Sequence, residues 1–129
     1  MRKVIGILLV VILILGCTGC ADAIVHDRNG AGSITYVYGS LYISEELSAL
    51  EISRILDILD DKLEVPLTPD CGFSAAVSFC IGDYTYALAK DGCPLLYNCT
   101  TERCITLSEE ERQELETLFT SRGGIFPCN

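Results

Sequence analysis

Eight cysteines and a single histidine are the side chains of this 129-residue chain best suited to chemistry. The six cysteines beyond residue 20 contain no C-x-x-C pair of the kind that binds zinc. The histidine, His26, stands beside Asp27 in a polar, glycine-rich stretch that we expect to be solvated. Nucleophilic catalysis needs a base held firmly next to its nucleophile, so the sequence predicts no enzyme, no metal site and no cofactor.

The first two cysteines, Cys17 and Cys20, close an N-terminal stretch typical of an export signal. Arg2 and Lys3 precede an unbroken apolar run over residues 4–15. Twelve apolar residues are too few for a stable membrane span but suit a signal peptide. We therefore expect residues 1–20 to direct export, to the cell envelope or the exterior.

Three processing sites compete in this stretch. Cys17 and Cys20 each follow a small residue, as the lipidated cysteine of a bacterial lipoprotein does, and the segment Ala21-Asp22-Ala23 is an ordinary site for release of a soluble protein. Lipidation would hold the domain at a membrane face without a spanning helix. A lipoprotein is the favoured hypothesis, with a soluble secreted form as the alternative.

Charge limits the partners. The chain carries a net charge of −9, and loss of two cations with the signal would make it −11. An acidic surface repels nucleic-acid phosphates and anionic lipid headgroups, so neither is an expected ligand. A basic protein remains a possible partner, and the sequence identifies no small-molecule ligand.

The six later cysteines indicate a disulfide framework, because an even number in a small exported domain is typical of one. Cys99 and Cys104 would face each other across a four-residue loop, residues 100–103, and so pair. Cys128 would then join Cys71, Cys80 or Cys93. Nine strand residues would hold Cys71 far from Cys80, so these two are poor partners for each other. Cys71 is the favoured partner of Cys128, which leaves Cys80 for Cys93.

Hydrophobic patterning predicts an α+β fold in one domain, residues 34–129, after a flexible tether at 21–33. Two helices are expected at about 44–63 and 108–122, beginning at Ser44 and Ser108 with acids in the first turn. An antiparallel sheet of about four or five short strands would pack on them. Its clearest hairpin has Gly82-Asp83 as the turn and pairs Phe79 with Tyr86, which puts the large side chains on one face.

The chain from Cys71 onward resembles a loose group of small exported bacterial domains of unknown function. The similarity rests on four segments: Cys71-Gly72-Phe73-Ser74, Asp91-Gly92-Cys93, Ser108-Glu109-Glu110-Glu111 and Gly123-Gly124-Ile125-Phe126-Pro127-Cys128. Cys80, Cys99 and Cys104 lie outside the shared pattern. The resemblance implies an α+β domain and implies no activity.

Two functions follow as hypotheses. The first is an exported, membrane-anchored interaction module without enzymatic activity. The alternative is an acidic inhibitor or immunity-type protein that blocks a basic exported enzyme, presenting the stretch 93–97 and attracting its target by charge.

Overall fold

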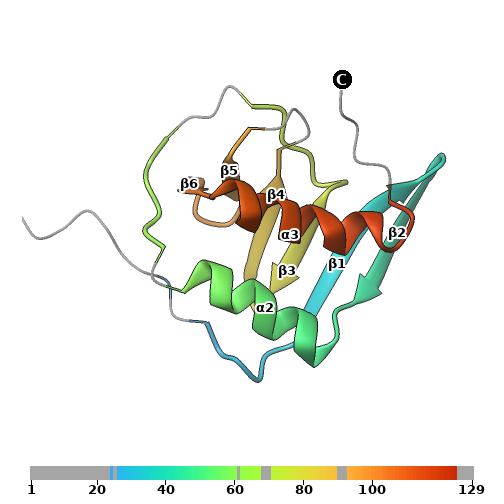
Figure 1. The fold of residues 1–129 in the computed structure, drawn as a ribbon, viewed down its shortest axis with the longest axis horizontal. Coiled ribbons are helices and arrows are strands. Elements are labelled where there is room, and N and C mark those ends of the chain that lie inside the picture. Colours follow the sequence, from blue (N-terminus) through green and yellow to red (C-terminus); the bar gives the residue numbers. More distant parts are fainter. Residues whose placement is uncertain (1–23, 25, 61, 68–70, 90–92, 125–129) are drawn as a thin grey trace, which may run out of the picture.

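The computed structural model describes residues 24, 26–60, 62–67, 71–89 and 93–124. It is an α+β fold in which six antiparallel strands form one sheet, in the order β2-β1-β3-β4-β5-β6. Two helices lie together on one face of that sheet (Figure 1). Within the described ranges, no helix is long and apolar enough to cross a membrane. The predicted fold class is confirmed, with one strand more than expected.

The centre of the sheet is the hairpin of β3 (Ser78–Ile81) and β4 (Tyr84–Leu88). Its predicted register is confirmed, because Phe79 pairs with Tyr86 and Ile81 with Tyr84. Gly82 opens the turn with φ +57°, a conformation that glycine adopts without strain. Phe79 and Tyr86 are almost fully buried and their rings stack at 5.5 Å, so this face is the core side.

A second hairpin, β1 (Gly32–Tyr38) and β2 (Leu41–Glu46), extends the sheet beyond β3. Gly39, with φ +62°, begins its two-residue turn, and Tyr38 pairs with Leu41. The sequence assigned residues 44–46 to the start of a helix, and this was wrong. They belong to β2, because the turn at Gly39 sends the chain back along β1.

The first helix in the described residues, α2 (Ala49–Leu59), begins five residues later and ends four residues earlier than the expected 44–63. Its N-cap is Ser48, whose hydroxyl accepts from the Glu51 N–H while the Glu51 carboxylate accepts from the Ser48 N–H. This reciprocal pair needs an acid three residues after the serine. Ser44 has Leu47 at that position, so it cannot form the pair. Leu47 is instead buried in the core.

The second helix, α3 (Glu109–Thr120), confirms the prediction. Ser108 and Glu111 form the same reciprocal pair, and an apolar stripe of Leu115, Leu118 and Phe119 is buried. Together with the buried face of α2 and the large face of the sheet, this stripe makes one core. Its members from the strands and α2 include Ile34, Tyr36, Ile52, Ile55, Leu56, Leu59, Phe79, Ile81, Tyr86, Leu88 and Leu96.

Strands β5 (Leu95–Asn98) and β6 (Arg103–Thr106) follow β4 in the sheet, and β6 forms the edge opposite β2. Asn98 pairs with Arg103, so the hairpin loop is residues 99–102. A backbone bridge then covers the outer edge of β6. The Val65 N–H donates to the Cys104 carbonyl and the Cys104 N–H to the Val65 carbonyl, each at 2.9 Å.

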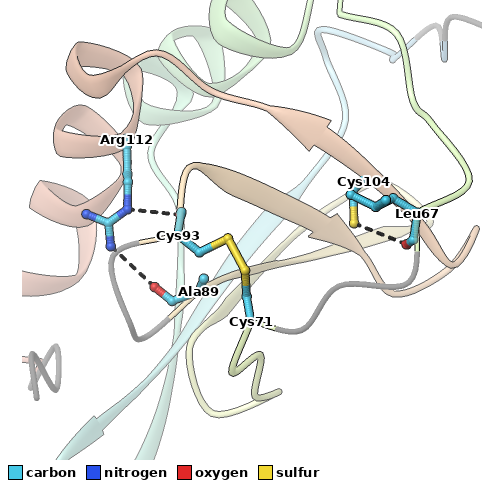
Figure 2. The surroundings of a disulfide bond; sticks show 6 residues. All are labelled: Leu67, Cys71, Ala89, Cys93, Cys104 and Arg112. Atoms are coloured by element: carbon cyan, nitrogen blue, oxygen red, sulfur yellow. Dashed lines mark hydrogen bonds between the residues drawn. A yellow bond between two sulfur atoms is a disulfide. The ribbon is translucent and has the colours of Figure 1, made fainter.

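Figure 2 shows how α3 is attached beside the Cys71–Cys93 disulfide. The Arg112 guanidinium, almost fully buried, donates to the carbonyl of Cys93 at 3.2 Å and to that of Ala89 at 3.3 Å. Glu116, one turn later, forms an ion pair with Arg112. The helix thus satisfies two carbonyls at the ends of the β4–β5 connection while its own buried charge is compensated.

Stability should depend on the α2 face that lies under the sheet. Ile55 is fully buried, whereas Leu50 on the same helix is 63% exposed. Ile55→Asp should lower the free energy of unfolding by more than about 3 kcal/mol, because it buries an unpaired charge. Leu50→Asp should change it by less than about 0.5 kcal/mol. Urea titrations of both variants test this, and equal effects would contradict the core assignment.

Candidate functional site

Polar side chains gather at the end of the sheet where the loop between β5 and β6 meets residues 62–67. Glu64 is only 3% exposed and Asn98 is fully buried. The Asn98 amide donates to one oxygen of Glu64 at 2.6 Å, and the Thr101 hydroxyl donates to the other at 2.9 Å. The side-chain amide oxygen of Asn98, Oδ1, accepts from the backbone N–H groups of Thr100 and Thr101 in the loop. Both oxygens of the buried carboxylate are therefore occupied from within the protein.

His26 joins this end of the sheet and is not solvated as the sequence suggested. Its Nε2 lies 2.9 Å from the hydroxyl of Tyr86, and its ring meets those of Tyr84 and Tyr86 edge-on, at 5.3 and 5.8 Å. Burial lowers the pKa of His26 below its usual 6.5, although the charges of Asp60 and Glu64 act in the opposite direction. Burial raises the pKa of Tyr86, so its hydroxyl can donate to the neutral imidazole.

A carboxylate, an imidazole and a phenol near one another can in principle move protons. Here Tyr86 is fully buried and bonds to His26, and Glu64 is bonded to Asn98 and Thr101. Two open cavities of about 310 and 360 Å³ adjoin the cluster, the first lined in part by His26 and the second by Glu64 and Arg103. Because these hydrogen bonds join different segments, the cluster acts as a latch that fastens the N-terminal segment and the β5–β6 loop.

Arg28 fastens the same N-terminal segment to α2. Its guanidinium donates to the carboxylate of Asp57 at 3.2 Å and also contacts that of Asp60. All three side chains are about half exposed, so each ion pair contributes little alone. With His26 and β1, which begins at Gly32, these contacts differ from the expected flexible tether at 21–33: its described part from residue 26 onward lies against the domain.

The predicted cysteine pairings were wrong. Cys71 is bonded to Cys93, which excludes the favoured Cys71–Cys128 and Cys80–Cys93 pairs. Cys99 and Cys104 are both free, because Cys104 pairs with Tyr97 and the loop begins one residue earlier than expected. That single step puts Cys99 in the loop. Cys17, Cys20 and Cys128 lie outside the described residues.

The three free thiols of the described residues are not bonded to one another, although Cys80 and Cys99 both lie beside Thr85. Cys104 is buried and its thiol approaches the Leu67 carbonyl at 3.6 Å. Cys80 lies 3.2 Å from the Thr85 hydroxyl on the sheet face away from the helices. Burial of the thiols raises the pKa of Cys99 and Cys104 above the usual 9.0, so both stay protonated at neutral pH. Across the part of the chain that the structure describes, no His, Cys, Asp and Glu residues cluster as a metal site would require.

Three large exposed apolar side chains lie together at the β1–β2 hairpin. Tyr38, Leu41 and Tyr42 are 55%, 63% and 76% exposed and surround the β1–β2 turn. We call these three residues the hairpin patch. Sequence reasoning missed it because a helix was expected to start at residue 44, which leaves no room for the strand β2 after the turn. Comparison with protein-family models, curated proteins and solved structures gives no match.

The latch predicts a pH dependence of stability. Because the pKa of His26 is lower in the folded protein than in the unfolded chain, the unfolded chain binds more protons as the pH falls through about 6.5. The free energy of unfolding should therefore decrease between about pH 7.5 and 5.5, where carboxylates stay ionised. His26→Gln should flatten this slope in urea titrations. An unchanged slope would show that protonation of His26 does not affect the free energy of unfolding.

The disulfide can be mapped directly. Alkylation of unreduced protein followed by peptide mapping should find Cys71 joined to Cys93 and label on Cys80, Cys99 and Cys104. Cys93→Ser should lower the free energy of unfolding by about 3 kcal/mol, since the bond closes a loop of about 22 residues. Cys99→Ser should have little effect. A peptide joining Cys99 to Cys104 would contradict the observed register.

Proposed function

We propose that this chain is an exported interaction module without enzymatic activity, held at a membrane face by a lipid on Cys17 or Cys20. The observation that carries the proposal is the hairpin patch, because its three large apolar side chains are exposed around a single turn, and apolar surface gathered in one place is typical of interaction sites. The Cys71–Cys93 disulfide supports export, since such bonds persist in oxidising compartments.

The fastened N-terminal segment supports a lipid anchor with a defined geometry. His26 follows Cys20 by only six positions, which can span at most about 20 Å. A lipid on Cys20 would therefore hold the latch end of the domain close to the bilayer. The turn of the β1–β2 hairpin lies at the opposite end of the molecule from the start of the described chain (Figure 1). The hairpin patch would then face away from the membrane, towards partners.

The inhibitor alternative has lost one of its two supports. The sequence led us to expect a constrained loop over residues 93–97. In the structure, Leu95–Asn98 is strand β5 inside the sheet, and Leu96 is fully buried. Only the acidic charge still favours that alternative. An interaction module is therefore the better supported proposal.

Metabolic labelling tests the anchor. In a bacterial host, a palmitate analogue should label the full-length protein, and either Cys17→Ala or Cys20→Ala should abolish the label. Cys99→Ser is the matched control, because Cys99 is exposed and free yet lies far along the chain. Absence of label, together with a mature N-terminus at Ile24, would establish the soluble secreted form and overturn the anchored one.

A further inference from the structure

The two edges of the sheet are treated differently. At β6, the Val65 backbone occupies the outer edge through its paired hydrogen bonds with Cys104. At β2, no other strand of the described ranges pairs with the outer side. An unpaired edge is a template for another strand, and natural proteins normally shield such edges.

The free backbone groups of β2 can be assigned from its register. The Leu47 N–H donates to the Gly32 carbonyl at 2.9 Å, which fixes the alternation of the β1–β2 ladder. Leu41, Ile43 and Glu45 therefore direct their N–H and C=O groups towards β1. Tyr42, Ser44 and Glu46 direct theirs outward. Tyr42, Ser44 and Glu46 thus present the N–H and C=O groups of a complete strand edge.

Apolar side chains flank this edge on both faces of the sheet. Leu41 pairs with Tyr38 on the face that carries the helices, where the Tyr38 ring lies against Gly123. Tyr42 pairs with Val37 on the opposite face. A strand added to β2 would place its alternate side chains against Leu41 on one face and Tyr42 on the other. Strand addition therefore uses Leu41 on one face and Tyr42 on the other, whereas a flat partner would reach only one face.

Charge selects the occupant. The carboxylate of Glu45 is engaged by the Tyr36 hydroxyl and by Arg122, but Glu46 is exposed at the end of the strand, and the chain as a whole carries −9. β2 is thus apolar at its start and acidic at its end. Two copies related by a two-fold axis would pair antiparallel and set the apolar end of each against the acidic end of the other. Opposite charge favours a basic partner instead.

We propose that β2 binds an extended segment of a basic exported protein by strand addition, with apolar residues of that segment on Leu41 and Tyr42 and a lysine or arginine at Glu46. This inference rests on the proposed function as an interaction module and names its binding surface and partner chemistry. Backbone hydrogen bonds to β2 supply affinity, and the apolar and acidic ends set the register.

A synthetic peptide with the pattern Lys-Thr-Thr-Thr-Val-Val is a direct probe of this surface, because in an antiparallel strand its two adjacent valines would face Leu41 and Tyr42 while its lysine would face Glu46. It should bind the exported full-length domain in fluorescence anisotropy, and a version with N-methyl groups on alternate amides should not, because it cannot complete the ladder. Leu41→Lys and Glu46→Lys should each weaken binding by about tenfold or more. The matched controls Leu63→Lys and Glu110→Lys, on exposed residues away from β2, should change it less than about twofold.

Four results would overturn the inference. The probe fails to bind, the controls weaken binding as much as the β2 variants do, or the N-methylated probe binds equally well. A dimer in light scattering that Leu41→Lys dissociates would also overturn it, in favour of a second copy as the occupant. Failure of lipid labelling leaves this inference intact, whereas loss of probe binding in a labelled protein refutes the inference and leaves the anchor.

Discussion

The structure depends on the register of one central hairpin. Pairing of Phe79 with Tyr86, set by the turn at Gly82, directs the large side chains of β3 and β4 to one face. A slip of one residue would turn these side chains away from the helices. Because β1 attaches to β3 and β5 attaches to β4, that register is transmitted across the sheet and decides where both helices find an apolar surface.

Local signals in the sequence predicted the elements whose determinants are close together along the chain. The Gly82 turn and the start of α3 at Ser108 are each set within a few residues, and both were placed correctly. The start of α2 was wrong because Ser44, followed by Glu45 and Glu46, carries the same local pattern of a serine before acids. The complete Ser48–Glu51 pair was the signal that could have distinguished Ser48 from Ser44.

Contacts between distant segments could not be predicted in this way. His26 reaches Tyr86 across 60 residues, and Glu64 reaches Asn98 across 34, so no local pattern announces either contact. The cysteine pairing failed for a related reason. A shift of one residue in the β5–β6 loop removes Cys99 from the position opposite Cys104, and loop length alone does not reveal that shift. The two ends of the molecule differ. At the end near His26, hydrogen bonds between side chains hold several segments together, whereas at the β1–β2 hairpin the outer backbone edge of β2 is exposed.

The unequal edges also bear on how this fold avoids indefinite assembly. A sheet that is open at both sides can recruit copy after copy, which is how cross-β fibres lengthen. Here Val65 occupies the side at Cys104, so growth in that direction is terminated. A second copy that paired its own β2 with this one would close the assembly at two, because the remaining edge of each sheet is already bonded to Val65 at Cys104. The unequal edges therefore limit edge-to-edge growth of this fold to a single pairing.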